Sequence, residues 1–536
     1  MPTYNLAYIL ERTTERFPDR EAVVCGAKRW TFAQLNAAAD SVAAGLAARG
    51  IEPGDRVALS CVNSPDFTVA YFAILKAGAT VVPLNVLLRA REIEFHLRDS
   101  GAKAYLCFDG TPELPIGTEG RAAFEAAENC RVFVPIASGL GIRGGIEPSL
   151  DTLVADNAPH TTVETDEDDT AVILYTSGTT GNPKGAELRH RNMRDNALLA
   201  EALFGADERD PDRYLCVLPL FHSFGQTVVQ NSAIAFGGTI VMMPRFEPAE
   251  ALDLMASENV TFFAGVPTMY WSLLPAAASA TGEAVPWATL RVAVSGGAAL
   301  PVAIHEQFEN TFGLQILEGY GLSETSPVAC FTPRGPEVRV GSIGRPVPGV
   351  DVRLLDPNTW SEVDPHLDGT GRTAVGEIAI RGHNVMKGYF NNESATAAVL
   401  REDWFRTGDL AVRDQDGYYY IVDRSKDMII RGGFNVYPRE IEEILCAHPD
   451  ISLAAVVGVP HDSHGEEIHA YVILQPGVTR SEADIVSWTK TQVAAYKYPR
   501  TVEIVETLPM TATGKILKRE LRTRGTDVRG AEVRES

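Results

Sequence analysis

Apolar and polar residues along the first part of the chain predict strands and helices in alternation. Residues 31–50 carry Leu, Val and Ala at helical spacing, and Thr31 and Gly50 are signals for the two ends of that helix. Further predicted strands span 55–61, 79–85, 170–178, 237–244, 261–267 and 291–297, and further predicted helices span 65–78, 251–260 and a segment after Pro301. Alternation of this kind is typical of parallel sheets flanked by helices.

The pattern changes after about residue 340, where short strands such as 376–382 and 417–424 are separated by Gly, Pro and Asp turns. We expect a small antiparallel or barrel-like section there. Beyond it lie a predicted helix, 438–449, and two strands, 453–460 and 469–476. The sequence therefore predicts an α/β fold in which residues 1–423 form a large domain of parallel-rich αβ layers plus the small β section. Residues 424–536 are expected to form a small mobile α+β domain.

Composition narrows the classes of partner. The chain has 536 residues, more than one typical domain, and its net charge is −22. Such a chain repels nucleic acid and anionic lipid, so we expect neither as a partner. Its seven cysteines show no metal or redox spacing, and its N-terminus has no long apolar core. Because the most apolar window, 227–243, is interrupted by polar residues and a Gly pair, we expect no membrane span and a cytoplasmic location.

Residues 175–185 read YTSGTTGNPKG, a loop suited to an anion. Glycines let backbone N–H groups converge, and hydroxyls and a lysine add donors. A Walker A loop is excluded, because Pro183 stands where the second glycine should be and Gly185 replaces Ser or Thr. A phosphate-binding loop is the interpretation that remains, with a plain polar connection as the alternative.

This loop resembles the signature of the adenylate-forming superfamily, which includes acyl-CoA synthetases, coumarate-CoA ligases, luciferases and peptide-synthetase adenylation domains. Further motifs recur in the family's order over nearly the whole chain: LPLFHSFG (218–225), SGGAALP (295–301), EGYGLSETSP (318–327), GSIGRPVPG (341–349), WFRTGDL (404–410), DRSKDMIIRGGFNVYPREIE (423–442) and ATGKILKREL (512–521). The MIIRGG form is similar to that of fatty-acyl-CoA ligases. The resemblance implies an AMP-forming acid–thiol ligase that uses ATP, Mg²⁺ and CoA.

The resemblance also assigns roles in the large domain. The β- and γ-phosphates of ATP would be held by Thr176, Ser177, Gly178, Thr179, Thr180 and Lys184, and Mg²⁺ by Glu324 with the Thr176 hydroxyl. The rest of the nucleotide pocket would consist of Gly297, Ala298, Glu318, Gly319, Tyr320 and Ser323, with the ring of Tyr320 against adenine. Asp409 would accept hydrogen bonds from the ribose hydroxyls, and Arg424 would bind ribose or phosphate.

The small domain is expected to work with two faces. Lys515 resembles the family's catalytic lysine, a point cation suited to the α-phosphate and the substrate carboxylate together. Lys426 resembles the hinge residue. Rotation about it would bring Gly432 and Gly433 to a pantetheine tunnel, where the absence of a Cβ atom lets the thiol arm pass. Lys497 is a candidate for contact with CoA phosphate.

His222 resembles the family's acyl-pocket histidine. The expected acyl pocket consists of Phe221, His222, Ser223, Phe224, Gly225, Val266, Pro267, Gly296, Gly297, Tyr320, Gly321, Pro327 and Val328. These stretches contain no Arg or Lys, so a second substrate carboxylate would be costly to bury. A monocarboxylate with an apolar body is expected, with a medium- or long-chain fatty acid first and a cinnamate- or benzoate-like acid second.

One departure concerns Ile430, where coumarate ligases and luciferases carry a lysine, and it weakens the aryl-acid interpretation. Three other functions stay open on the sequence. They are a free-standing enzyme that loads an acyl carrier protein, a luciferase-like oxygenase and a nucleotide-binding regulator without catalysis. Retention of Lys515, Glu324 and Asp409 argues against the last of these. Either a monomer or a homodimer is compatible with the sequence.

Overall fold

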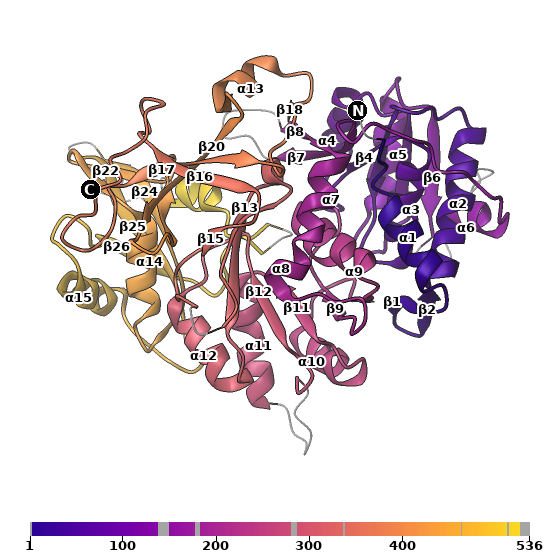
Figure 1. Ribbon diagram of the computed structural model, residues 1–536. Helices are drawn as coiled ribbons and strands as arrows, with labels where there is room; N and C mark the ends of the chain where they lie inside the picture. Colours follow the sequence, from indigo (N-terminus) through magenta and orange to yellow (C-terminus); the bar gives the residue numbers. More distant parts are fainter. Residues whose placement is uncertain are drawn as a thin grey trace.

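The computed structural model describes residues 3–137, 149–176, 183–279, 287–335, 338–461, 464–511 and 514–525. Within these ranges the chain forms two large, parallel-rich sheets, then a smaller antiparallel sheet, then a mixed sheet in the C-terminal section (Figure 1). The predicted α/β class, with a small α+β section at the C-terminal end, is confirmed.

The larger of the two N-terminal sheets has nine strands in the described residues, in the order β15-β14-β13-β12-β11-β9-β10-β1-β2. Its strands are β1 (Glu21–Cys25), β2 (Lys28–Thr31), β9 (Arg213–Cys216), β10 (Thr239–Met242), β11 (Phe262–Gly265), β12 (Val292–Ser295), β13 (Ile316–Gly321), β14 (Val328–Phe331) and β15 (Arg345–Pro346). Strands from β1 across to β13 pair in parallel, and the two ends of the sheet are closed by antiparallel pairs.

The second large sheet has seven strands among the described residues, in the order β18-β8-β7-β4-β3-β5-β6. They are β3 (Arg56–Ser60), β4 (Thr80–Pro83), β5 (Ala104–Phe108), β6 (Val132–Ile136), β7 (Thr170–Thr176), β8 (Lys184–Arg189) and β18 (Gly388–Tyr389). Strand β18 comes from far along the chain and pairs with β8, so that Tyr389 lies opposite Ala186. This long-range pairing brings a distant segment to the loop 175–185.

The two smaller sheets follow the predicted change of pattern. The first is antiparallel and contains β16 (Val350–Leu355), β17 (Gly376–Gly382), β19 (Leu400–Arg401), β20 (Trp404–Arg413) and β21 (Tyr419–Arg424). The C-terminal sheet contains β22 (Ile429–Arg431), β23 (Phe434–Val436), β24 (Ile451–His461), β25 (Gly465–Leu474) and β26 (Thr501–Ile504). The placement of the domain boundary at residue 423 stays a prediction.

Helices cover the sheets, and local signals set several of their ends. Thr31 caps the second helix, because its side chain accepts a hydrogen bond from Gln34 N while the Gln34 side chain accepts one from Thr31 N. The helices are α1 (Tyr8–Arg16), α2 (Phe32–Ala48), α3 (Pro65–Lys76), α4 (Ala90–Asp99), α5 (Ile116–Ala126), α6 (Leu150–Ala155), α7 (His190–Leu198), α8 (Ala200–Phe204), η1 (Phe224–Asn231), α9 (Ser232–Ala235), α10 (Pro248–Ser257), α11 (Pro267–Ser279), α12 (Val302–Phe312), η2 (Ser323–Thr325), α13 (Glu393–Val399), α14 (Pro438–Cys446) and α15 (Glu482–Gln492).

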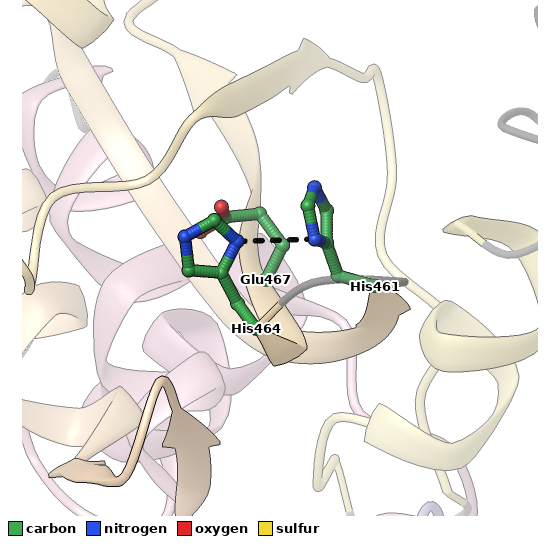
Figure 2. A group of neighbouring side chains, drawn as sticks. All are labelled: His461, His464 and Glu467. Carbon is green, nitrogen blue, oxygen red and sulfur yellow. Dashed lines mark hydrogen bonds between the residues drawn. The ribbon is translucent and has the colours of Figure 1, made fainter.

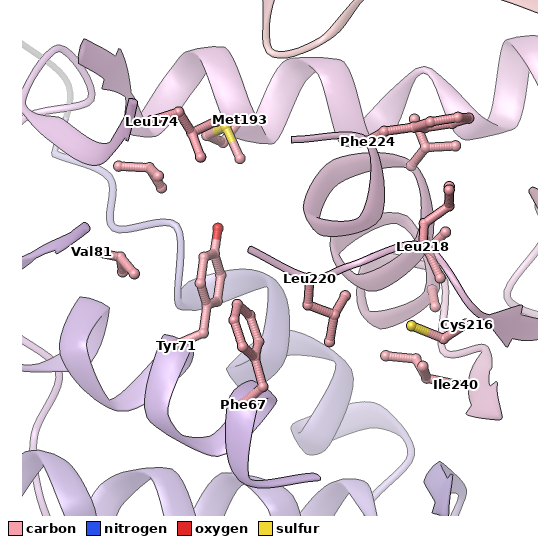
Figure 3. Close-up of a cluster of buried hydrophobic side chains, with 14 of the residues drawn as sticks. Phe67, Tyr71, Val81, Leu174, Met193, Cys216, Leu218, Leu220, Phe224 and Ile240 are labelled. Atoms are coloured by element: carbon pink, nitrogen blue, oxygen red, sulfur yellow. The ribbon is translucent and has the colours of Figure 1, made fainter. Parts of the chain in front are cut away.

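Helix α3 is buried on nearly all sides and joins the two large sheets. Figure 3 shows Phe67 of α3 near Leu220, in one cluster with Cys216 of β9 and Ile240 of β10, while the ring of Tyr71 points toward Leu174 and Met193. Polar links reinforce the contact, because Thr68 Oγ1 donates to Gln230 Oε1 at 2.8 Å. Gln230 lies on η1, which is a π-helix. The apolar core beneath the cleft therefore fixes η1 and the residues just before it.

The C-terminal section lies at the opposite side of the molecule from α1–α6 (Figure 1). It contacts the large domain through α11, since Trp271 Nε1 donates to Ser452 Oγ at 2.9 Å. Thr268 Oγ1 also lies 3.4 Å from the carbonyl oxygen of Gly514. Among the helices of the described ranges, none combines the length and the apolarity needed to cross a bilayer.

Candidate active site

A cleft of about 1340 Å³ opens where the sheets meet, and residues of both the large and the C-terminal section line it. Of the predicted site residues, the cleft wall contains Thr176, Lys184, His222, Gly297, Gly319, Tyr320, Ser323, Glu324, Arg424, Lys426 and Lys515. Ser177, Gly178, Thr179 and Thr180 lie outside the described residues. The fold thus gathers side chains from segments as far apart as residues 176 and 515.

Asp409 lies just behind the cleft wall, where two close contacts with the lining residues Tyr320 and Arg424 hold its carboxylate. Tyr320 Oη donates to Asp409 Oδ2 at 2.7 Å, and Arg424 Nε lies 2.8 Å from Oδ1. Asp409 and Arg424 face each other across the β20–β21 pair. A carboxylate has about four acceptor positions, so each oxygen keeps one for a further donor. Two acceptor positions on the carboxylate therefore remain, and the assignment of Asp409 to the ribose hydroxyls stays a prediction.

Glu324 and Thr176 form the predicted oxygen pair on another wall of the cleft. Thr176 Oγ1 lies 3.5 Å from Glu324 Oε1, and Tyr389 Oη donates to the same carboxylate oxygen at 2.9 Å. Glu324 is only 8% exposed, so its buried carboxylate oxygens need hydrogen-bond partners of this kind. Burial, followed by the charge of Glu324, raises the pKa of Tyr389 and keeps it a hydrogen-bond donor. These oxygens fit a hard divalent cation that also takes phosphate oxygens.

Sequence reasoning did not identify Tyr389. Its only local signal is a short Gly-Tyr stretch, and it reaches the site because β18 pairs with β8. The Lys184 ammonium lies 5.2 Å from the centre of the Tyr389 ring, and Lys184 faces Thr176 across the β7–β8 pair. Tyr389 therefore connects the carboxylate of Glu324 with the cation of the phosphate loop.

Lys515 enters the cleft on a short hairpin. Thr511 N donates to Lys515 O at 2.8 Å, and Lys515 N donates to Thr511 Oγ1 at 3.1 Å. Burial, and next the charge of Arg424, lowers the pKa of Lys515 to about 8. The ammonium is thus charged at neutral pH, although it stands near two other cations.

Three cations, Arg424, Lys426 and Lys515, line one part of the cleft in a chain of net charge −22. Burial, and then the charge of Arg424, also lowers the pKa of Lys426. Asp409 pairs with Arg424 and offsets part of the repulsion, but the charge of Arg424 still disfavours the charged forms of Lys426 and Lys515. A polyanion such as a triphosphate relieves this repulsion.

His222 is neutral in this environment. Burial, and second the charge of Lys515, lowers the pKa of His222 to about 4. Phe224 N donates to Nδ1 of His222 at 3.3 Å, which leaves the proton on Nε2. The residue can therefore donate a hydrogen bond to an anionic oxygen without adding a fourth charge.

The end of the cleft next to His222 is apolar. Its wall includes Phe224, Val228, Val266 and Val328, with Gly296 and Gly297 between them. A Cβ atom on Gly296 would stand 3.1 Å from the Phe224 ring, so glycine leaves the space beside that ring open. Of the expected acyl-pocket residues, Pro267 does not line the cleft, whereas Arg91, Phe95 and His96 of α4 line it without having been predicted.

Besides Asp409 and Pro267, five predicted residues of the described ranges lie outside the cleft wall: Ala298, Glu318, Gly432, Gly433 and Lys497. Glu318 is buried and accepts a hydrogen bond from Gly341 N at 3.2 Å, and burial raises its pKa to about 7. Gly432 and Gly433 form the exposed turn between β22 and β23, with φ angles of +56° and +85°. Their assignment to a thiol tunnel stays a prediction.

Comparison with known proteins agrees with this geometry. The sequence model of the AMP-binding enzyme family matches residues 10–390, and that of the AMP-binding enzyme C-terminal domain matches residues 440–515. The chain is 33% identical to a long-chain-fatty-acid–CoA ligase of Bacillus subtilis, over 97% of this chain and 94% of that protein. It is 37% identical to a feruloyl-CoA synthase of Amycolatopsis, over 96% of this chain and 97% of that protein.

Among solved structures, ATP-bound MatB from Rhodopseudomonas palustris is similar to this chain with a TM-score of 0.86 and 34% identity. The similarity covers 98% of this chain and 100% of that chain. The predicted superfamily and the predicted class, an AMP-forming acid–thiol ligase, are confirmed by these relatives. Thr176, Lys184, Arg424 and Lys515 line one cleft, and the matched family models cover most of the chain, which therefore belongs to the AMP-binding enzyme family of adenylate-forming enzymes.

Proposed function

We propose that this chain activates a monocarboxylic acid with an apolar body as its acyl-adenylate and transfers the acyl group to CoA. The observation that carries the proposal is the position of Lys515. It comes from the C-terminal section, yet it lines the same cleft as Thr176 and Glu324 of the large domain. The first candidate for the acid is a medium- or long-chain fatty acid. The proposed location of the enzyme is the cytoplasm.

In the first half-reaction a substrate carboxylate oxygen attacks the α-phosphorus of ATP, and the bond from that phosphorus to the bridging oxygen breaks to release pyrophosphate. Both reactants are anions, so the chain must neutralise charge and position them. Lys515 and Arg424 supply the fixed positive charge at the cleft, and neutral His222 supplies an N–H donor beside the apolar end. Asp409 orients the ribose.

Mg²⁺ fits the oxygen pair of Glu324 and Thr176, and when bound it would neutralise phosphate charge. Tyr389 orients the Glu324 carboxylate by its 2.9 Å hydrogen bond. Lys184, from the opposite strand, adds a cation to the phosphate loop. The residues of this wall therefore position the phosphates that leave as pyrophosphate.

In the second half-reaction the CoA sulfur attacks the acyl carbonyl carbon, and AMP leaves with the bonding electrons. The Gly432–Gly433 turn lies outside the cleft in the present arrangement, with open space where a Cβ atom of Gly433 would stand. Rotation of the C-terminal section about Lys426 would exchange the Lys515 hairpin for this turn. The glycines would then leave room for the pantetheine arm.

An aryl acid is the second candidate, and the 37% identity to the feruloyl-CoA synthase favours it. The wall formed by Phe224, Val228 and Val266 suits either an alkyl chain or a ring. Loading of an acyl carrier protein uses the same chemistry, since the carrier also presents a pantetheine thiol. A monomer or a homodimer is compatible with each of these.

The test is a panel of acids assayed for pyrophosphate release and for CoA-dependent AMP formation. Octanoate and palmitate compare two alkyl chain lengths, and ferulate and benzoate test whether the enzyme accepts an aromatic acid. We expect both products with an apolar monocarboxylate and little with a dicarboxylate such as succinate. If pyrophosphate is released but no thioester forms when CoA is added, the result would favour an acyl carrier protein as the acceptor of the acyl group. Absence of release with every acid would contradict the proposal.

A further inference from the structure

Two histidines meet beside the hairpin that joins the long strands of the C-terminal sheet. His461 ends β24, and His464 directly precedes β25. Their Nδ1 atoms lie 3.2 Å apart, and Glu467 stands next to them on β25 (Figure 2). One ligand atom from each of the three residues lies within 4.8 Å of the others. This group is separate from the cleft, because none of the three lines it.

The spacing of the two imidazoles suits a metal. A tetrahedral Zn²⁺ site has Zn–N bonds of about 2.0–2.1 Å, so two of its ligand atoms stand about 3.3–3.4 Å apart. The observed Nδ1–Nδ1 separation of 3.2 Å is close to that edge length. Two imidazole nitrogens and a carboxylate oxygen also form a ligand set that binds zinc in proteins and leaves a fourth position for water.

Glu467 is the anchored member of the group. The residue is 3% exposed, and its Oε1 lies 2.5 Å from Arg431 Nε while Oε2 lies 3.0 Å from Arg431 Nη2. A carboxylate has about four acceptor positions, and Oε1 also accepts a hydrogen bond from Ile468 N at 3.0 Å, so the position that remains is on Oε2. Ligand atoms up to 4.8 Å apart are farther apart than a tetrahedral edge, so metal binding would require the histidine side chains to move toward the carboxylate.

We propose that His461, His464 and Glu467 form a binding site for a divalent transition metal, with Zn²⁺ as the preferred ion. The imidazole pair selects Zn²⁺ over Mg²⁺ and Ca²⁺, which prefer oxygen ligands. The site is therefore distinct in chemistry as well as position from the Glu324–Thr176 pair in the cleft.

The location gives the site a consequence for catalysis. Gly432 N donates to the carbonyl oxygen of His464 at 2.8 Å, and a Cβ atom on Gly432 would stand 3.7 Å from the His464 ring. A metal on His464 would thus fix the residue that holds the Gly432–Gly433 turn. This consequence rests on the proposed function. If the Gly432–Gly433 turn serves the thiol half-reaction, a bound metal slows that half-reaction and leaves adenylation unchanged.

The binding test is a Zn²⁺ titration of the full chain in competition with a chromophoric chelator. The comparison is between the unchanged protein and the double variant His461→Ala/His464→Ala, after thermal melting without metal has shown that both are folded. His366→Ala is the matched control, because His366 is an exposed histidine beside a carboxylate, Asp364. We expect the double variant to bind one equivalent of Zn²⁺ less than the unchanged protein, or to bind Zn²⁺ at least tenfold more weakly. His366→Ala should keep the stoichiometry and the affinity of the unchanged protein.

Equal stoichiometry and affinity in the unchanged protein and the double variant would overturn the site. If the double variant unfolds, Zn²⁺-edge anomalous scattering from crystals of the unchanged protein decides instead, with a peak between the two Nδ1 atoms as the supporting result. Absence of a peak there in zinc-soaked crystals would overturn the proposal equally.

The functional arm measures the two half-reactions separately with and without one equivalent of Zn²⁺. We expect a loss of threefold or more in thioester formation, unchanged pyrophosphate release, and no loss in the double variant. Zinc binding with undiminished thioester formation would overturn the link to the turn. Absence of both half-reactions in the metal-free protein would instead count against the proposed function, whatever the binding result.

Discussion

The C-terminal section presents two faces of opposite character. The hairpin with Lys515 turns into the cleft, and Gly514 packs so closely against the large domain that a Cβ atom there would stand 2.7 Å from Thr268 Oγ1. The turn at Gly432 and Gly433 lies in solvent, between Ile430 and Phe434, whose exposures are 52% and 56%. A charged face occupies the active site while an apolar face with glycines does not. On the proposed function, this difference would allow one small domain to serve two chemical steps in succession.

Among the changes that test the two faces, removal of the Lys515 ammonium should have the largest effect on the rate of adenylation. Lys515→Ala takes one charge from the three-cation group, so adenylation should fall by about a hundred- to a thousand-fold. Transfer to CoA from supplied acyl-adenylate should stay largely intact, because that step uses the other face. The measurement is pyrophosphate release alongside single-turnover thioester formation.

Lys490→Ala is the matched control for that change, since Lys490 is an exposed lysine on α15 of the same section. It should leave both half-reactions unaltered. Equal loss of both steps in Lys515→Ala would contradict the division of labour between the faces.

The pH dependence sharpens the role of the same ammonium. With a pKa lowered to about 8, Lys515 is protonated at pH 7 and becomes neutral above about pH 8. The kcat/KM for pyrophosphate release should therefore fall about tenfold per pH unit above that point, because a neutral amine no longer offsets the reacting anions. In Lys515→Arg the guanidinium stays charged, and the alkaline limb should disappear even if the rate is lower.

An unaltered alkaline limb in Lys515→Arg would assign the titration to another group. The measurement needs saturating Mg²⁺ and an acid whose carboxyl is ionised throughout the range, so that only the protein titrates.

The opposite face is tested by Gly433→Leu. A leucine side chain has room in the present arrangement, because nothing lies within 4 Å of the Cβ position. It would fill the tunnel predicted for the thiol arm, so thioester formation should fall by roughly ten- to a hundred-fold. Pyrophosphate release should change little.

The φ angle of +85° at Gly433 adds strain that has nothing to do with the tunnel. Gly477→Leu controls for it, since Gly477 has a φ angle of +79°, open space around it and a place in the same section. If Gly477→Leu loses thioester formation to the same extent, or Gly433→Leu turns over CoA normally, the tunnel assignment is wrong.

The smallest effect is expected at the contact between α11 and β24. Trp271→Phe keeps the ring but removes the 2.9 Å hydrogen bond to Ser452, worth about 0.5–1.5 kcal/mol. Adenylation should slow by about two- to tenfold, because the arrangement with Lys515 in the cleft becomes less populated. Thioester formation should be unchanged or slightly faster.

A double-mutant cycle with Ser452→Ala checks this contact, since the two changes should not add if they remove one interaction. Trp287→Phe, at a tryptophan that packs on Phe312 of the large domain, is the control for loss of an indole N–H elsewhere. Additive effects of the Trp271 and Ser452 changes would show that the hydrogen bond does not couple the domains.

Much of the fold followed from local patterns. Thr31 caps α2 as its position before an apolar-periodic run indicates, and the alternation of strands and helices gives the two parallel-rich sheets. The motifs around Thr176 and Glu324 also identified part of the cleft wall. These features depend on neighbours in sequence, on backbone periodicity and on residue type, so they can be read without coordinates.

The sequence by itself thus determined the family and the class of reaction, and it predicted many of the residues that line the cleft. Tertiary structure alone decided which of them meet: that Tyr389 reaches Glu324 through the β18–β8 pair, that α4 lines the cleft, and that η1 is a π-helix. It also decided that Lys515, not the Gly432–Gly433 turn, occupies the cleft in this arrangement. The reason is physical, because burial, pKa and proximity depend on packing between segments that no local pattern encodes.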